Sequence, residues 1–203
     1  MKKKIGILDL NISNLESVKS ACIYEEIDFK IIKNKNDFQE CHGLIIPGVG
    51  SFGQAINNLL KNDLYDLLKK EIKEKPTLGI CLGMHLLTET SEESPNVKGL
   101  GLLEGKCLKF NADLIVPHIG WNTINMRKKS YLFRNIKDQT PFYFVHSYYV
   151  KIENKKNIIT ETNYKNFNFV SSFNCENIYG VQYHPEKSSI HGLEVYKNFK
   201  ELL

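Results

Sequence analysis

The chain has 203 residues, of which 42% are hydrophobic, 25% charged and 11% aromatic. These fractions are typical of a globular protein and argue against a disordered or fibrous chain. A chain of this length can bury a sizeable core without disulfides, so we expect a single domain that spans residues 1–203. The 27 basic and 23 acidic side chains leave a net charge of +4, which is too small and too scattered to indicate a nucleic-acid partner.

The sequence also lacks the patterns expected for membrane or metal binding. Only a few apolar residues follow the basic first residues before Asp9, and no later apolar run approaches 18 residues. We therefore expect a cytoplasmic protein without a membrane partner. The five cysteines form no Cys-x-x-Cys pair and match no common ligand spacing, so we expect neither disulfides nor a metal site, and no cofactor.

Strands and helices are expected to alternate in the first half of the chain, because short apolar runs alternate with apolar residues three or four positions apart. The predicted strands are 4–9, 29–32, 43–46 and 77–81, and the predicted helices begin near Leu15, Phe52, Leu64 and Leu82, the last of them running to Thr90. Ser13 and Glu16 are spaced as a capping box for the first helix. The alternation predicts right-handed βαβ units and a parallel sheet with helices on its faces.

The pattern of predicted elements changes beyond Pro95, where strand-like segments predominate. Strand-like segments at 102–110, 142–150, 168–173 and 178–183 precede a final helix over 191–203. No repeat, linker or low-complexity segment separates the two halves. We therefore expect an α/β fold with a flavodoxin-like, mostly parallel sheet flanked by helices, and antiparallel strands in the C-terminal half.

Cys81 stands in the most informative local pattern, Gly79-Ile80-Cys81-Leu82-Gly83, between a predicted strand and a predicted helix. This is the nucleophile-elbow pattern with cysteine in place of serine, and its glycines permit a sharp strand-to-helix turn. The start of a helix favours the thiolate form of a cysteine. A buried cysteine between two packing glycines is the alternative, and an activated thiolate would also oxidise readily.

A nucleophilic thiol needs a base, and the base needs an orienting group. His184 and Glu186 occur in Tyr183-His184-Pro185-Glu186-Lys187, near the end of the last predicted strand. If His184 ends that strand, the two side chains project to the same side, since strand side chains repeat every second residue. Cysteine, histidine and glutamate in this order predict a triad for acyl transfer, although His184 alone would read as a surface histidine.

A loop with two glycines, Pro47-Gly48-Val49-Gly50, directly follows the third predicted strand. Such a loop can turn a backbone N–H toward a developing oxyanion, and the amide of Leu82 is the natural second donor. The loop could equally cradle a phosphate, but no Lys-Ser or Lys-Thr follows it.

Taken together, these motifs resemble those of the class I (triad) glutamine amidotransferases, and most closely the glutaminase subunits of imidazole glycerol phosphate synthase from histidine biosynthesis. The elbow and the His-Pro-Glu motif are common to the whole family, whereas two further segments are typical of this branch. The matching segments run along the whole chain: Asp9-Leu10, Asn14-Leu15, Ser17-Val18, Pro47-Gly48-Val49-Gly50, Gly79-Ile80-Cys81-Leu82-Gly83-Met84, Pro117-His118-Ile119-Gly120-Trp121-Asn122, Phe144-Val145-His146-Ser147-Tyr148 and Gly180-Val181-Gln182-Tyr183-His184-Pro185-Glu186-Lys187-Ser188.

The resemblance implies the roles of individual residues. Cys81 would attack the side-chain amide of glutamine, His184 would pass a proton to the departing ammonia, and Glu186 would hold the imidazole. The oxyanion amides would be those of Val49 and Leu82. The residues that would contact the substrate are Gly50, His85, Ser147 and Tyr148.

The resemblance also implies a partner. In this branch ammonia passes into a separate (β/α)₈-barrel cyclase subunit, with which the glutaminase subunit forms a heterodimer. Trp121 and Asn122, expected in a loop, and Lys187 would lie at that interface.

The sequence departs from the family pattern at two places. The family has Cys-Leu-Gly-Met-Gln where this chain has His85 in the last position, and the 9–14 loop lacks its usual glycines. Both changes are compatible with a paralogous glutaminase subunit that feeds another synthase, such as a sugar-amidating enzyme. A peptide-cleaving cysteine hydrolase and a non-catalytic binding module with a decayed site are the alternatives from other classes.

Overall fold

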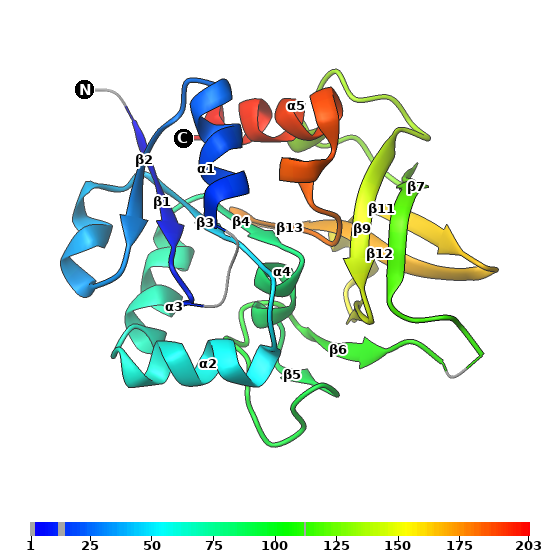
Figure 1. The fold of residues 1–203 in the computed structure, drawn as a ribbon, viewed down its shortest axis with the longest axis horizontal. Helices are drawn as coiled ribbons and strands as arrows, with labels where there is room; N and C mark the ends of the chain where they lie inside the picture. The colour runs from blue at the N-terminus through cyan, green and yellow to red at the C-terminus, as the bar shows by residue number, and fades with distance from the viewer. Residues whose placement is uncertain (1–2, 12–14, 112) are drawn as a thin grey trace.

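A computed structural model describes residues 3–11, 15–111 and 113–203 (Figure 1). The predicted capping box of Ser13 lies outside these residues. The helices are α1 (Leu15–Tyr24), α2 (Phe52–Lys61), α3 (Tyr65–Glu74), α4 (Leu82–Leu86) and α5 (Ser189–Lys200), and short 3-10 turns cover Lys35–Glu40, Tyr131–Phe133, Lys155–Asn157 and Pro185–Lys187. The strands are β1 (Lys4–Leu8), β2 (Asp28–Ile32), β3 (Gly43–Ile46), β4 (Thr77–Ile80), β5 (Thr90–Ser91), β6 (Gly105–Lys109), β7 (His118–Thr123), β8 (Asn125–Met126), β9 (Pro141–His146), β10 (Tyr148–Ile152), β11 (Ile158–Tyr164), β12 (Phe167–Cys175) and β13 (Ile178–Val181).

The predicted parallel sheet is present. Its strands follow the order β2-β1-β3-β4-β13, and every neighbouring pair in this series is parallel. Every residue of β3 and β4 is buried, as expected for central strands covered on both faces. The carboxyl ends of these strands meet at one edge, so β4 brings Cys81 to the same edge as the segment that follows β13.

The antiparallel strands of the second half extend the same sheet, as predicted from the strand-like segments beyond Pro95. β12 pairs antiparallel with β13, and β10 pairs antiparallel with both β12 and β6. β7 and β9 form a separate two-stranded antiparallel sheet.

Helices cover both faces of the parallel strands, with α1 and α5 on one side and α2 and α3 on the other (Figure 1). The two layers correspond to two buried apolar clusters. One includes Val18 of α1 and Phe199 of α5, and the other includes Leu59 of α2 and Leu68 of α3. Burial of these aliphatic and aromatic side chains is the main driving force for this arrangement. No helix in the described part of the chain is long and apolar enough to cross a membrane.

Helix α4 ends at Leu86, so its predicted extension to Thr90 is wrong. The reason is tertiary hydrogen bonding. The carbonyl of Leu86 accepts from the N–H of Leu100 at 2.8 Å, and the carbonyl of Thr88 accepts from Gly101 at 3.0 Å. A strand segment then replaces helix, because Thr90–Ser91 pairs with β6.

The predicted strand over 142–150 is broken at Ser147, which lies between β9 and β10. β9 turns away to pair with β7, whereas β10 stays in the large sheet. Trp121 and Asn122 lie within strand β7, so their predicted placement in a loop is wrong. β7 is a strand because it pairs with β9, and the local sequence around Trp121 does not predict this pairing.

Candidate active site

Cys81 lies between the end of β4 and the start of α4, where the elbow pattern predicts a sharp turn. Its φ and ψ are 48° and −104°, a conformation that costs a residue with a Cβ about 1–3 kcal/mol. The backbone N–H of Cys81 donates to the carbonyl of Val181 at 2.8 Å, which fixes the turn against β13. The strained turn therefore presents the side chain of Cys81 at the carboxyl edge of the sheet.

The glycines around Cys81 allow three backbone segments to pack against one another. A Cβ on Gly83 would lie 1.9 Å from the carbonyl oxygen of Ile46, and one on Gly79 would lie 2.8 Å from the carbonyl group of Gly83. A Cβ on Gly48 would lie 2.4 Å from the backbone nitrogen of Leu82. Side chains at Gly83 and Gly79 would push α4 away from β3 and β4, and one at Gly48 would push the 47–50 loop away from the elbow.

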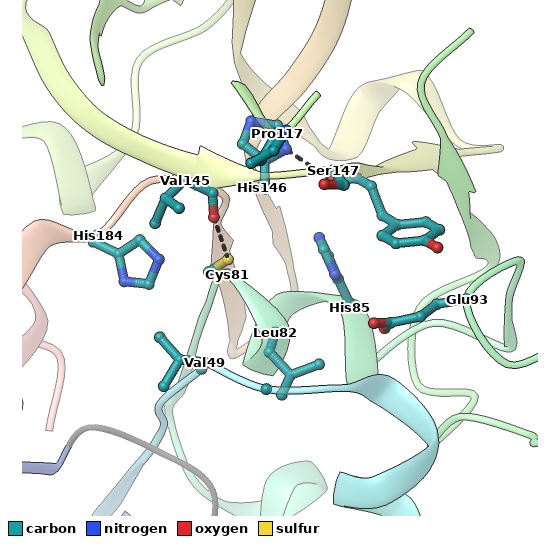
Figure 2. A pocket seen from close by; sticks show the side chains of 13 residues that line it. Val49, Cys81, Leu82, His85, Glu93, Pro117, Val145, His146, Ser147 and His184 are labelled. Carbon is teal, nitrogen blue, oxygen red and sulfur yellow. Dashed lines mark hydrogen bonds between the residues drawn. The ribbon is translucent and has the colours of Figure 1, made fainter. Parts of the chain in front are cut away.

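A cavity of about 300 Å³ opens over Cys81 (Figure 2). It brings together the nucleophile, the 47–50 loop, the start of α4 and the 145–148 segment. The lining residues are Gly48, Val49, Gly50, Cys81, Leu82, His85, Glu93, Pro117, Val145, His146, Ser147, Tyr148 and His184. Every residue predicted to contact substrate or oxyanion is among them.

His184 also lines this cavity, and its Nδ1 lies 2.7 Å from Oε1 of Glu186. The predicted reason for this contact is wrong, because β13 ends at Val181 and His184 does not end a strand. The contact arises instead in the 3-10 turn Pro185–Lys187, whose preceding residue is His184. Ser188 secures the turn, since its hydroxyl donates to the carbonyl of His184 at 2.6 Å and accepts from the N–H of Tyr143 at 3.0 Å.

The two ring nitrogens of His184 have different environments. Nδ1 faces Glu186, while Nε2 is buried and has no hydrogen-bond partner among the described residues. Burial lowers the pKa of His184, but attraction from Cys81 and from Glu186 outweighs burial and raises this pKa to about 10. The raised pKa enables His184 to take and hold a proton beside Cys81.

The sulfur of Cys81 has two further polar neighbours. Its S–H group points at the carbonyl oxygen of Val145, with 3.8 Å between sulfur and oxygen (Figure 2). Nε2 of Gln182 donates to the sulfur at 3.6 Å. Sequence reasoning missed both residues. Gln182 is two positions before His184, whereas Val145 carries no local signal because its contribution is a backbone carbonyl.

The amide of Leu82 is the first N–H of α4, so it has no intrahelical partner. Val49 lines the same cavity as Leu82, on the loop that packs against the elbow. Two backbone segments thus meet beside the sulfur where an oxyanion would form.

Among the described residues, Glu93 is the only carboxylate that lines the cavity, and sequence reasoning missed it. Its Oε2 accepts from the N–H of Phe52 at 2.8 Å, which ties it to the start of α2. An acidic side chain in the cavity wall can pair with a ligand ammonium group.

His146, also missed, links the cavity wall to strand β7. Its Nδ1 donates to the carbonyl of Tyr148 at 2.8 Å, so its Nε2 is left to accept from Nδ1 of His118 at 3.0 Å. Burial lowers the pKa of His146 well below its usual value and that of His118 to about 4. Both rings are therefore neutral near pH 7, and this chain of hydrogen bonds holds the 145–148 segment in place.

Trp121, Asn122 and Lys187 do not line the cavity. Trp121 is 55% exposed on β7 and contacts the ring of Tyr143 on β9 edge-on. Asn122 donates to the carbonyl of Asn163 at 2.9 Å, and Lys187 is exposed in the turn after Glu186. Across residues 3–11, 15–111 and 113–203, no group of three or more metal-ligating side chains could hold a metal ion.

A thiol on an elbow, next to a histidine held by a carboxylate, defines the class of triad enzymes that transfer acyl groups through cysteine. The model of the family "Glutamine amidotransferase class-I" matches residues 6–202, and the chain belongs to this family.

Several relatives are similar over nearly the whole chain. The chain is 44% identical over 200 residues to "Imidazole glycerol phosphate synthase subunit HisH" of Pyrococcus furiosus, covering 98% of this chain and 99% of the relative. It is 42% identical over 202 residues to the protein of the same name from Methanocaldococcus jannaschii, covering 98% and 100%.

Two solved structures share the fold at low sequence identity. One is described as a crystal structure of glutamine amidotransferase, with a TM-score of 0.78 and 16% identity over 98% of this chain and 97% of the other. The other is described as the structure of PurLQS from Thermotoga maritima, with a TM-score of 0.74 and 16% identity over 100% and 99%.

Proposed function

We propose that this chain is the glutaminase subunit of an imidazole glycerol phosphate synthase, which hydrolyses glutamine to glutamate and ammonia for histidine biosynthesis in the cytoplasm. The observation that carries this proposal is the strained elbow thiol of Cys81, which shares a cavity with a buried histidine held by Glu186 at 2.7 Å. Full-length similarity to relatives named as subunits of that synthase supports the pathway over the alternative of a paralogue for another synthase.

The chemistry follows from the pairing of a thiol with a histidine base. The proton of the Cys81 thiol passes to His184, the sulfur attacks the side-chain amide carbon of glutamine, and a tetrahedral oxyanion forms. His184 gives its proton to the amide nitrogen, the carbon–nitrogen bond breaks, and ammonia leaves a γ-glutamyl thioester. His184 then takes a proton from water, which attacks the thioester and releases glutamate and the thiol. Glu186 stabilises the imidazolium form at each proton transfer.

The backbone around the sulfur fits the charge that develops in this reaction. The amides of Val49 and Leu82 are the proposed donors to the oxyanion, an interaction worth about 10²–10³ in rate for each donor. The close packing of the 47–50 loop against the elbow supports this role, because it places both backbone segments beside the sulfur.

The remaining cavity wall is suited to a free amino acid. Glu93 is placed to pair with the α-ammonium group of glutamine, and Gly50, Ser147 and Tyr148 are proposed to bind its backbone atoms. His85 is proposed to contact the substrate only through the ring nitrogen that Gln182 leaves free. A carboxylate and several polar groups in a cavity of about 300 Å³ favour a small zwitterion over a peptide chain.

The proposed partner is a (β/α)₈-barrel cyclase that receives the ammonia. Strand β7 offers it an apolar surface, because Ile119 is 60% exposed and Trp121 is 55% exposed. Exposed aromatic side chains of this kind are typical of protein interfaces. Asn122 and Lys187 would provide polar contacts at the edge of the same surface.

The test is ammonia release from glutamine by the full chain, measured alone and with the cyclase subunit plus its ligand. We expect a low rate alone, a large rise with the partner, and no turnover by Cys81→Ala in either case. Identification of the cyclase product separates the histidine pathway from another synthase. Turnover by Cys81→Ala would contradict the nucleophile assignment, and equal rates with and without partner would contradict activation by the cyclase.

A further inference from the structure

His85 and Gln182 form a buried polar pair next to the sulfur of Cys81. Nε2 of His85 lies 2.9 Å from Oε1 of Gln182, and Nε2 of Gln182 lies 3.6 Å from the sulfur. The exposed fractions are 5% for His85, 0% for Gln182 and 7% for Cys81, so these contacts are shielded from bulk water. The pair joins two elements, since His85 lies in α4 and Gln182 immediately follows β13.

The direction of these hydrogen bonds follows from the chemistry of the three groups. The S–H of Cys81 points at the carbonyl of Val145, so the sulfur offers Gln182 only its lone pairs. The amide end that faces the sulfur is therefore the NH₂ group, and the oxygen end faces His85. Burial lowers the pKa of His85 to about 4, so the ring is neutral near pH 7 and has a single N–H. That N–H lies on Nε2, because Oε1 of Gln182 can only accept.

An amide N–H on the sulfur favours the thiolate over the thiol, because hydrogen bonds to charged acceptors are roughly twice as strong as those between neutral groups. The amide oxygen in the same place would repel the thiolate. Rotation of the Gln182 amide by half a turn exchanges the two ends, and the N–H of His85 opposes this rotation by holding the oxygen.

We infer that His85 is a positioning residue that acts through Gln182 to keep an N–H donor on the sulfur of Cys81. This inference rests on the proposed function, in which Cys81 is the nucleophile. It gives a physical role to the residue at which the chain departs from the family pattern. Glutamine, the usual residue at this position, also carries an N–H donor, so His85→Gln is the conservative variant.

The test follows the thiol itself, without glutamine or a partner. The full-length chain is alkylated with iodoacetamide across a pH series, and the adduct on Cys81 is quantified by mass spectrometry of its peptide, which separates it from the other four cysteines. We expect His85→Phe and Gln182→Met to alkylate about tenfold more slowly at pH 7. We expect the pH of half-maximal rate to rise by about one unit, which corresponds to that factor.

Two variants serve as controls. His85→Gln restores the donor, so its profile is expected to stay within about threefold of the unmodified protein. His42→Phe is the matched control, because His42 is exposed and lies just before β3, at the opposite edge of the sheet, and its profile is expected to be unchanged.

Unchanged profiles in folded His85→Phe and Gln182→Met would overturn the inference. If either variant fails to fold, Gln182→Glu keeps the size of the side chain and replaces the N–H by oxygen, so it must slow alkylation for the inference to stand. If the chain releases ammonia normally but His85→Phe does not change the alkylation of Cys81, the positioning role is wrong and the proposed function stands. If His85→Phe slows alkylation but the chain releases no ammonia with any cyclase, the proposed function is wrong and the positioning role stands.

Discussion

Gly83→Ala is expected to damage the elbow by a steric conflict that can be worked out from the structure. The new Cβ would lie 1.9 Å from the carbonyl oxygen of Ile46, whereas real Cβ contacts are essentially never below 3.0 Å. β3 and α4 must therefore separate locally by about 1.1 Å. Ile46 is fully buried at the end of β3, and closely packed protein interiors resist such a shift.

This displacement affects both stability and activity. Overpacking of this kind costs about 1–3 kcal/mol, which for a chain of this size lowers Tm by roughly 3–10 °C. A 1 Å misplacement of catalytic groups costs about 10²-fold in rate. We therefore expect a lower Tm in thermal unfolding and an approximately hundredfold lower rate of ammonia release in the presence of the cyclase.

Gly101→Ala is the matched control. Gly101 has φ of +62° with nothing within 4 Å of a new Cβ, so alanine there is strained but meets no neighbour. We expect a stability loss of about 1 kcal/mol with normal activity. If Gly83→Ala kept the Tm and rate of the unmodified protein, the inferred packing of the elbow against β3 would be refuted.

Four further predictions address the site and the partner surface. Cys81→Gly is expected to be about 1 kcal/mol more stable than Cys81→Ala in thermal unfolding, because glycine relieves the strain at φ 48°, and both should lack glutaminase activity; equal stability would contradict the strain. Glu186→Gln is expected to lower kcat roughly a hundredfold or more, because the amide cannot stabilise the His184 imidazolium; an unchanged kcat would remove its role. Burial lowers the pKa of His85 to about 4, below its value in the unfolded chain. Between about pH 6.5 and 4 the unfolded state therefore binds more protons than the folded state, so the free energy of unfolding decreases as the pH is lowered through that window. From pH 7 to pH 5 the unmodified protein should therefore lose about 2 kcal/mol more than His85→Gln in denaturant unfolding, and parallel losses would refute this. Trp121→Ala is expected to weaken binding to the cyclase by at least about 2 kcal/mol, or thirtyfold in Kd by calorimetry, while the Tm of the isolated chain stays the same, since the side chain is 55% exposed.

The sequence predicted the parts of the site that depend on local constraints. Two glycines around Cys81, between an apolar run and a helical pattern, leave the backbone few alternatives to a sharp turn, and the turn is present. His184 and Glu186 are two positions apart, so they meet at short range, although a 3-10 turn brings them together where a strand was predicted.

Long-range pairing decided the segments where the predictions failed. Leu86 and Thr88 have carbonyl groups that bond with the 100–101 segment, which ends α4 early. The break at Ser147 exists because β9 and β10 join different sheets, and it brings the carbonyl of Val145 to Cys81. Neither effect is visible in a local window, because the partners lie far along the chain.

What the sequence by itself determined is therefore the alternation of strands and helices, the elbow at Cys81 and the pairing of His184 with Glu186, since backbone sterics and short-range spacing control these features. Only the tertiary structure decided which other groups surround the sulfur. Glu93 and Val145 reach the cavity, and Gln182 reaches the sulfur, because separate strands and helices pack against one common core, and the free energy of that packing belongs to the whole chain.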